Sequence, residues 1–393
     1  MTQDKSIASR RATALAELLD IPDSYYQLAT ERYRSLGEWL HRPESQVAGY
    51  EPAVCSQGSF RYGTVNRPLF KKDEYDLDAV AELLLLTKGD MSQKNVKRLL
   101  GDEVKAYAAA RNFTAPPEEK PRCWRLDYAD KVKFHMDILP AIPEDEMFKQ
   151  ALARRGVDPD LAMWSIAITD YRHPAYAAIQ RDWPQSNPKG FARWFEARMR
   201  VQAERQLKAM LEQRALASID DVPTWEWKTP LQRAIQILKR HRDVMFKDNC
   251  DVAPISMILT TLAAHAYVGE DDLHDALAGI LDRMPAHVRS TAPRIPNPVN
   301  PGEDFADRWK SDARLEPNFW KWHMRAKADV EALSGFLNSA EIREYAEKNL
   351  RLDLDDDTTR NLASDPRVGG SAVRPSAVAP IVIASAPKPW AQR

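Results

Sequence analysis

Two aspartates spaced two residues apart inside an apolar run are the feature that most restricts how this chain can fold. Asp76 and Asp78 lie in the run Tyr75-Asp76-Leu77-Asp78-Ala79-Val80. On a β-strand, residues two apart project from the same face, so the two carboxylates would stand side by side. Asp137 lies in a second alternating run, Phe134-His135-Met136-Asp137-Ile138-Leu139. Because unpaired buried carboxylates are costly, these two strands predict a site that holds a cation.

A Gly-Ser turn precedes the first acidic strand and offers groups that suit phosphate. Gly58 would let the backbone approach a ligand closely, and Ser59 supplies an N–H and a hydroxyl to phosphate oxygens. Three carboxylates together with phosphate oxygens are the hard ligands that Mg²⁺ or Mn²⁺ prefers. Two such ions could activate an attacking hydroxyl and stabilise a departing pyrophosphate. The pattern predicts a metal-dependent nucleotidyltransferase whose catalytic and metal-binding residues are Asp76, Asp78 and Asp137.

The prediction depends on the combination of these parts. A single Gly-Ser pair occurs in many turns, and a single Asp-x-Asp is usually a strand end or a solvated turn. Here the turn and the two acidic strands follow one another in order, and apolar residues surround both acidic sites. Arg61 and Arg125 could reach phosphates or pair with surface acids. His135 is more typical of a residue that orients a metal ligand than of a base.

These residues also carry a resemblance to a known family. The chain resembles the polymerase-beta-type nucleotidyltransferase superfamily. More narrowly, it is similar to the bacterial CD-NTases, the oligonucleotide cyclases of CBASS anti-phage defence that are related to cyclic GMP–AMP synthase and oligoadenylate synthase. The narrower match covers roughly residues 20 to 340 and rests on segments 58–64, 74–78, 122–126, 134–140, 183–190 and 297–301. The resemblance implies an α+β fold in which a nucleotidyltransferase palm and a helical second domain enclose the active site in a cleft.

The resemblance further implies a reaction and a biological role. A nucleotide 2′- or 3′-hydroxyl would attack the α-phosphate of a second NTP, and ring closure would give a cyclic di- or trinucleotide second messenger. We expect NTP substrates, ATP among them, and a CBASS regulatory protein as a partner. Two alternatives stay open: nucleotidyl transfer to a protein, an RNA end or a small-molecule acceptor, and an inactive scaffold. The presence of all three aspartates argues against the scaffold.

Two residues in the second half of the chain are assigned through the resemblance. Relatives carry a lysine that contacts the triphosphate where this chain has Lys239, and a serine near the nucleotide where it has Ser256. From the pattern alone, a solvated basic edge is favoured for Lys239 and Arg242. Many relatives follow the serine with a tyrosine that stacks on a base, whereas this chain has Met257. The predicted nucleotide-binding residues are Gln57, Gly58, Ser59, Lys239 and Ser256.

Charge and composition restrict the partners. The 56 Lys and Arg residues balance 57 Asp and Glu residues, so the net charge predicts no stable nucleic-acid partner. The chain shows no apolar run that approaches a membrane span and no apolar leader at its start. Its three scattered cysteines are typical of free thiols in a reducing compartment. We therefore expect a cytoplasmic monomer that does not bind membranes.

Hydrophobic periodicity divides the 393 residues into four regions. Residues 1–48 repeat apolar positions at helical spacing, with Pro22 between two helices, and we expect them to brace both lobes. Residues 49–185 mix strands with helices and form the predicted palm. Residues 186–362 are predicted to be helical. Residues 363–393, rich in Ala, Ser, Pro and Val, are expected to form a flexible tail.

Overall fold

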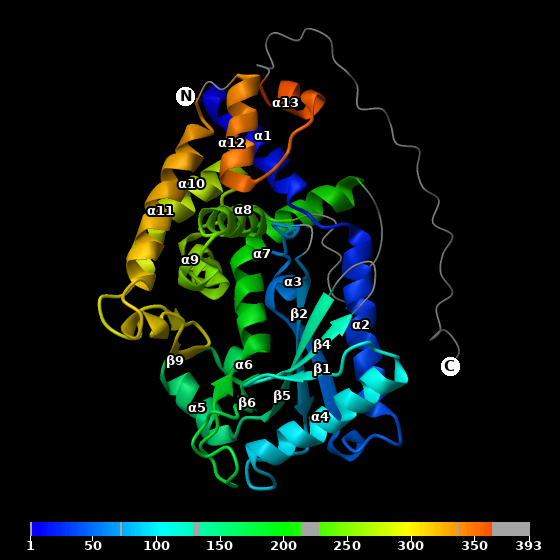
Figure 1. The fold of residues 1–393 in the computed structure, drawn as a ribbon. Helices are drawn as coiled ribbons and strands as arrows, with labels where there is room; N and C mark the ends of the chain where they lie inside the picture. Colours follow the sequence, from blue (N-terminus) through cyan, green and yellow to red (C-terminus); the bar gives the residue numbers. More distant parts are fainter. Residues whose placement is uncertain (1, 71–72, 129–133, 214–227, 336–337, 364–393) are drawn as a thin grey trace.

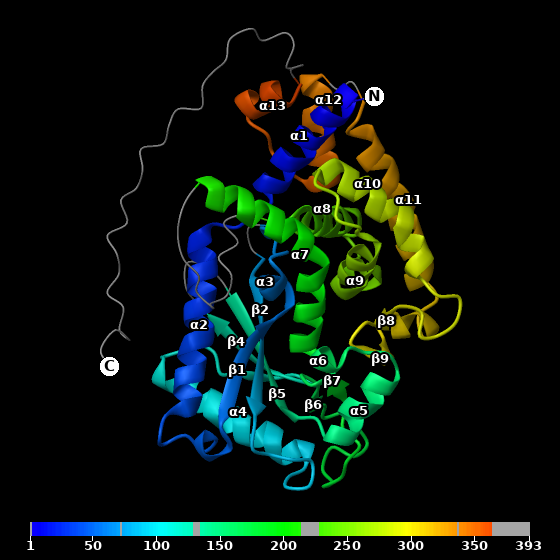
Figure 2. The same cartoon turned by 180° about the vertical axis from the view of Figure 1, so that it is seen from behind.

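The computed structural model describes residues 2–70, 73–128, 134–213, 228–335 and 338–363. The chain forms a sheet-based lobe and a helical lobe, so the predicted α+β class is confirmed (Figure 1). The long helix α7 (Pro188–Gln213) runs from the sheet lobe into the helical lobe, as the view from behind shows (Figure 2). No helix among the described residues is both long enough and apolar enough to span a membrane.

A seven-stranded mixed sheet organises the first lobe. Its main path is β1 (Pro52–Gln57), β2 (Tyr75–Leu83), β5 (Phe134–Pro143), β4 (Trp124–Tyr128) and β3 (Glu118–Glu119). Strand β6 (Ile166–Ile168) pairs with β5, and β7 (Gln185–Ser186) pairs with β6. Strands β2 and β5 run parallel, whereas the other pairs are antiparallel.

Helices cover the sheet because alternate strand residues are apolar. Leu77 on β2 and Met136 on β5 are fully buried, and helices α2 (Asp23–His41) and α4 (Gln93–Ala110) pack apolar side chains into the same core. The short helices α3 (Gly58–Tyr62), α5 (Glu146–Arg154) and α6 (Pro159–Ala162) complete this lobe. The alternation that places Leu77 inside the core turns its neighbours Asp76 and Asp78 toward the opposite face.

The helical lobe has its own core. It contains α8 (Pro230–Met245), α9 (Ser256–Ala266), α10 (Leu273–Arg283), α11 (Leu315–Ala332), α12 (Ser339–Leu350) and α13 (Asp356–Ala363). Helix α8 begins at a capping box formed by Thr229 and Gln232, with a proline in its first turn. Leu15 of α1 (Thr2–Leu18) packs in this helical core, whereas Leu36 of α2 packs in the sheet core. The N-terminal segment therefore contacts both cores.

One segment departs from the predicted helical character of residues 186–362. A two-stranded hairpin, β8 (Pro296–Asn297) and β9 (Asn300–Asp304), lies between α10 and α11. Helix formation fails there because prolines recur at 293, 296, 298 and 301 and remove the amide donors that a helix needs. Short 3₁₀ turns occupy Ala48–Tyr50, Cys250–Val252, Met284–His287 and Asp307–Lys310. Residues 364–393, nearly all of the predicted tail, lie outside the described residues.

Candidate active site

Strand register brings the Gly-Ser turn and the acidic residues together. The β1–β2 pairing aligns Gln57 with Asp78, so the turn that follows Gln57 lies beside the acidic end of β2. The parallel β2–β5 pairing aligns Asp78 with Asp137. Neighbouring strands lie about 4.8 Å apart, and aligned side chains share a face. The two acidic runs that the sequence separates by about 60 residues are thus adjacent in the sheet.

Glycine is required at position 58 because the backbone there lies very close to the carboxylate of Asp78. The φ of Gly58 is +69°, a left-handed value that favours glycine, and a Cβ atom built at this position would lie 2.0 Å from Oδ2 of Asp78. Any other residue would push against the carboxylate. The turn can therefore bring its backbone against the acidic site only with glycine at this position.

The carboxylates of Asp76 and Asp78 are not neutralised by hydrogen bonds. No hydrogen bond or ion pair of either side chain is found within the described part of the chain. Asp76 is exposed and Asp78 is half-buried, so they face the cleft rather than the apolar core that their sequence context suggested. Desolvation, with the negative charges of Asp76 and Asp137 adding to it, raises the pKa of Asp78 to about 7. Desolvation also raises the pKa of Asp76. Two repelling carboxylates without partners fit a divalent cation.

Asp137 differs because an arginine already pairs with it. Arg125, its neighbour across the β4–β5 pairing, donates from Nε to Oδ1 and from Nη2 to Oδ2, both at 2.8 Å. These hydrogen bonds raise the pKa of Arg125. Arg125 therefore pairs with a predicted metal ligand rather than with a surface acid. Asp137 can reach an ion shared with Asp78 only if Arg125 releases it or shares it.

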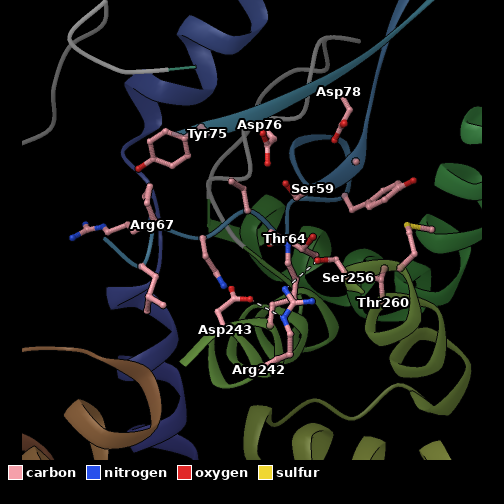
Figure 3. Close-up of a pocket in the computed structure, with 18 of the residues that line it drawn as sticks. Ser59, Thr64, Arg67, Tyr75, Asp76, Asp78, Arg242, Asp243, Ser256 and Thr260 are labelled. Atoms are coloured by element: carbon pink, nitrogen blue, oxygen red, sulfur yellow. Dashed lines mark hydrogen bonds and ion pairs between the residues drawn. The ribbon is translucent and has the colours of Figure 1, made fainter. Parts of the chain in front are cut away.

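A cavity of about 360 Å³ opens in front of the acidic site, and both lobes line it (Figure 3). The sheet lobe supplies Gly58, Ser59, Thr64, Asp76 and Asp78, and the helical lobe supplies Lys239, Arg242, Ser256 and Thr260. Six of the eight sequence-predicted site residues, together with Arg242, therefore meet in one place. The cavity lies in the cleft between the lobes, as predicted.

Lys239 and Arg242 do not form a solvated edge, so that interpretation of the pattern is wrong. Nζ of Lys239 donates to the carbonyl of Thr64 at 3.0 Å, and desolvation, helped by the charge of Arg242, lowers the lysine pKa to about 8. Arg242 is buried and donates to the carbonyl of Pro254 at 2.6 Å and to Oγ of Ser256 at 3.2 Å. Helix α8 lies between the helical core and the sheet lobe, so its polar edge faces the cleft. There Lys239 lines the cavity, and Arg242 donates a hydrogen bond to Ser256.

A second cavity of about 260 Å³ lies on the other side of Asp78. Gly58, Tyr62, Asp78 and Met257 line both cavities. The second cavity adds Gln57 from β1, Asn187 and Phe191 at the start of α7, and Asn297, Glu303 and Phe305 from the hairpin region. Gln57 thus lines the neighbouring cavity rather than the one that contains Ser59. The acidic site has room for a ligand on either side.

Several lining residues gave no signal in the sequence. Tyr75, Asn66 and Arg67 line the first cavity, and the last two lie in a loop without periodicity. The ring of Tyr75 packs against Tyr25 with centroids 5.6 Å apart, which fixes it at the cavity wall. Glu303 of the second cavity accepts a hydrogen bond from Nδ2 of Asn297 at 2.7 Å, and burial raises its pKa. The sequence shows that Glu303 follows a proline-rich stretch, but it does not show that this side chain lines the second cavity.

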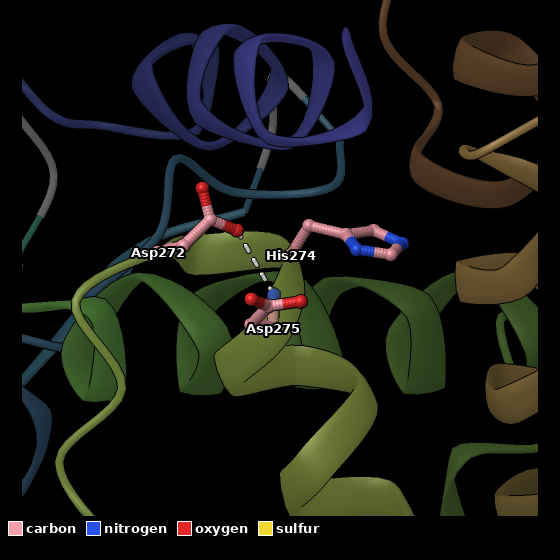
Figure 4. Close-up of side chains that lie close together, drawn as sticks. All are labelled: Asp272, His274 and Asp275. Carbon is pink, nitrogen blue, oxygen red and sulfur yellow. Dashed lines mark hydrogen bonds between the residues drawn. The ribbon is translucent and has the colours of Figure 1, made fainter. Parts of the chain in front are cut away.

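Another group of potential metal ligands lies away from both cavities. Among the described residues, ligand atoms of Asp272, His274 and Asp275 come within 4.8 Å of one another, whereas those of the three predicted aspartates do not form such a set. Asp272 accepts from the backbone N–H of Asp275 at 3.0 Å and caps α10. Figure 4 draws the three side chains. Nε2 of His274 is used in a hydrogen bond with Oγ of Ser334 at 3.0 Å. This group is therefore a helix cap.

The comparisons with known proteins agree with this geometry. Residues 52–140 match the family model described as cyclic GMP-AMP synthase DncV-like, nucleotidyltransferase domain. The chain is 29% identical over 310 residues to the c-di-GMP synthase of Roseivirga ehrenbergii, covering 78% of this chain and 74% of the relative. It is 25% identical over 350 residues to the cyclic dinucleotide synthase CdnG of Bradyrhizobium diazoefficiens, covering 83% and 76%. The nucleotidyltransferase domain at residues 52–140 is that of a DncV-like CD-NTase. It is thus a nucleotidyltransferase, and the matched segment spans the Gly-Ser turn and all three aspartates.

Solved structures of other CD-NTases share the fold of this one. The structure of B. diazoefficiens CdnG in complex with GTP superposes on this CD-NTase with a TM-score of 0.61 at 22% identity, covering 92% of this chain and 98% of that chain. A chain of the Escherichia coli MS115-1 CdnC:HORMA-deltaN complex gives a TM-score of 0.57 at 12% identity, covering 88% and 96%. These likenesses show that the two-lobed architecture is common to the family.

Proposed function

We propose that this CD-NTase joins two nucleoside triphosphates into a cyclic dinucleotide, with GTP as one substrate, and releases pyrophosphate. The observation that carries the proposal is the pair of cavities that share Asp78 as a common wall. One cavity suits the nucleotide whose α-phosphate is attacked, and the other suits the nucleotide that brings the hydroxyl. The relatives named c-di-GMP synthase and CdnG support a dinucleotide product, and the GTP complex of CdnG supports the choice of GTP.

The first cavity provides groups for a triphosphate. Ser59 would donate from its backbone N–H and hydroxyl to phosphate oxygens, and Gly58 allows that approach. Lys239 would place its ammonium against the β- and γ-phosphates, because it is half-buried beside the cavity and has no acidic partner in the described chain. Ser256, held by Arg242, would hydrogen-bond the same nucleotide. These groups stabilise the negative charge that grows on the leaving pyrophosphate.

Asp76, Asp78 and Asp137 are the proposed catalytic residues. The reaction forms a bond between the hydroxyl oxygen and the α-phosphorus and breaks the bond to the oxygen that bridges to the β-phosphorus. Asp76 and Asp78 would hold Mg²⁺ or Mn²⁺, and we propose two ions in the working site. Bound ions lower the pKa of the attacking hydroxyl and offset charge on the phosphates. Asp137, now paired with Arg125, would join them when Arg125 shares its carboxylate, and it would help to bind the ion that activates the hydroxyl.

The remaining predictions fit this function. We propose the domain division 1–48, 49–185, 186–362 and 363–393, supported by the contacts of the N-terminal helices with both cores. We also propose a cytoplasmic monomer that accepts ATP as well as GTP and acts in CBASS defence. A regulatory protein partner is supported by the CdnC:HORMA complex of a protein with the same fold.

Product analysis tests the proposal. The full chain is incubated with GTP, ATP, CTP and UTP, singly and mixed, with Mg²⁺ or Mn²⁺, and the products are identified by mass spectrometry. The Asp76→Ala/Asp78→Ala variant should give no product while it stays folded. The control Asp102→Ala/Asp248→Ala removes two acids that line neither active-site cavity and should retain activity. Product that forms only after a protein, RNA or small hydroxyl compound is added would favour transfer to an acceptor instead.

A further inference from the structure

A third cavity, of about 640 Å³, lies outside the active site and is larger than either of its two cavities. It lies where α6, α7, α9, the 3₁₀ turn Met284–His287 and the β8–β9 hairpin come together. We call it the aromatic–arginine pocket. The lining residues that give it its character are Arg193, Trp194, Thr261, His265, His287 and Arg289.

Three aromatic rings lie next to one another along one wall of this pocket, with Trp194 tilted by 57° from His265. The rings of Trp194 and His265 have centroids 4.9 Å apart, and those of His265 and His287 are stacked at 5.3 Å with an interplanar angle of 20°. Desolvation, together with the charge of Arg198, lowers the pKa of His265 to about 4, so this imidazole is neutral near pH 7. Neutral flat rings beside a cavity are suited to stacking on a planar heterocycle.

Positive charge surrounds the same wall without acidic partners. Arg193 and Arg289 line the pocket and are exposed, and Arg198 contacts Nδ1 of His265 at 3.5 Å. Within the described ranges, none of the three arginines forms an ion pair with a carboxylate. One acid, Asp158, lines the pocket, but its carboxylate accepts from the N–H of Asp160 at 2.9 Å and caps α6. The arginines outnumber this one acid, and the net positive charge favours an anion.

A buried hydroxyl also lacks a partner there. Oγ1 of Thr261 is fully buried, lies on the α9 side of the pocket and has no hydrogen-bond partner among the described residues. Buried polar groups are normally satisfied, so an orphaned hydroxyl at a cavity wall is consistent with a missing ligand.

We propose that the aromatic–arginine pocket is a second nucleotide site, separate from catalysis. The base would stack on the wall formed by Trp194, His265 and His287, and the phosphates would pair with Arg193 and Arg289. The proposal goes beyond the function proposed above, and only the choice of guanine nucleotides as probes rests on that function. The ligand has two sources, the NTP substrate and the cyclic product, which share this chemistry.

Occupation of this pocket would be communicated to the active site. Helix α9 carries Ser256 and Met257 at the active-site cavities and His265 at the pocket, about two and a half turns further along. Helix α7 carries Phe191 at the second active-site cavity and Trp194 at the pocket. Asn297 of the hairpin lines both. A ligand that fixes these shared elements changes the geometry around Asp78, so the site is placed to regulate synthesis.

Equilibrium dialysis with radiolabelled GTP and cyclic di-GMP tests the proposal. The assay uses the full chain with Asp76→Ala/Asp78→Ala, which blocks turnover, so failure here is distinct from failure of the synthase proposal. Adding Arg193→Ala/Arg289→Ala should abolish nucleotide binding at the aromatic–arginine pocket or raise its Kd at least tenfold. Adding Arg98→Ala/Arg181→Ala, two exposed arginines elsewhere, should change nothing. The two labelled ligands distinguish substrate from product as the occupant.

A second comparison separates recognition of the base from recognition of the phosphates. His287→Ala should weaken GTP about fivefold and leave inorganic triphosphate unaffected, because triphosphate has no base to stack. Thermal unfolding of each variant, measured without nucleotide, verifies that it is folded. Unchanged binding in Arg193→Ala/Arg289→Ala overturns the proposal. The proposal is also overturned if inorganic triphosphate binds as tightly as GTP. It is overturned as well if an RNA or DNA oligonucleotide outcompetes GTP through the same arginines.

Discussion

Replacing Asp78 by asparagine should stabilise the metal-free protein although it removes a catalytic residue. In the fold, desolvation and the charges of Asp76 and Asp137 raise the pKa of Asp78 from 3.8 to about 7. Ionising this carboxylate at pH 8 therefore costs folding free energy, because the unfolded chain ionises it without that cost. Asparagine has nearly the same shape and carries no charge, so the cost disappears.

The size of the effect follows from the pKa shift. A shift of about three units corresponds to about 4 kcal/mol at 1.36 kcal/mol per unit. Because Asp78 is half-buried and water in the cleft screens it, we expect about 1 to 3 kcal/mol at pH 8. The folded pKa is raised, so this group's contribution to stability is complete below pH 3.8 and is lost as the pH rises to about 7. The advantage of Asp78→Asn should thus be near zero at pH 4 and reach its maximum above pH 7.

Urea unfolding in EDTA between pH 4 and pH 8 measures this difference. The control is Asp137→Asn, which breaks the Arg125 ion pair and should not stabilise the protein at any pH. Adding Mg²⁺ or Mn²⁺ with GTP should stabilise the wild type and leave Asp78→Asn largely unaffected. If Asp78→Asn were destabilising at pH 8 in EDTA, the carboxylate would have a partner that stabilises it, and the repulsion argument would be refuted.

Three further substitutions test individual groups. Lys239→Met should lower kcat/KM for NTP about 10- to 100-fold without lowering the melting temperature, because it removes a charge proposed to contact the phosphates. An unchanged kcat/KM would exclude Lys239 from the triphosphate site. Gly58→Ala should abolish pyrophosphate release and destabilise the protein by about 1 to 3 kcal/mol in urea unfolding, because the added Cβ would lie 2.0 Å from Oδ2 of Asp78. Retained activity would contradict the turn geometry. Arg61→Ala should change the free energy of unfolding by less than about 1 kcal/mol and leave KM for NTP unaltered, because Arg61 pairs with Glu196 at 2.5 Å on a part-exposed surface. A tenfold rise in KM would instead place Arg61 at a phosphate.

The parts of the site that follow local patterns could be predicted from the sequence. Alternation around Asp76 and Asp78 defines a strand whose apolar side is Leu77 and Ala79, and this periodicity reappears as burial in the structure. Gly58 could be singled out because a turn against an acidic strand needs a residue without a side chain. Asn187 could be expected as a helix cap, and it accepts a hydrogen bond from the N–H of Gly190 at 2.9 Å.

Features that depend on how separate elements meet could not be predicted. The Arg125–Asp137 pair depends on the β4–β5 register, which the two segments do not encode separately. Lys239 appeared solvated because its helix shows an apolar stripe on one side, whereas the sheet lobe covers the opposite side as well. The aromatic–arginine pocket combines residues from α7, α9 and a 3₁₀ turn that lie up to about 90 positions apart. Such sites become visible only when the lobes are assembled.

The number of pyrophosphates released for each nucleotide incorporated tests the central claim most directly. A closed ring forms one phosphodiester bond per nucleotide, so the synthesis of a cyclic dinucleotide releases one pyrophosphate for every GTP consumed, and the product resists phosphatase. A linear dinucleotide would release one pyrophosphate for two nucleotides and would lose its terminal phosphates to phosphatase. We predict a ratio of one with a phosphatase-resistant product in the wild type, and no release in Asp76→Ala/Asp78→Ala. A ratio near one half, or release that requires an added acceptor, would contradict the assignment of two nucleotides to the cavities on either side of Asp78.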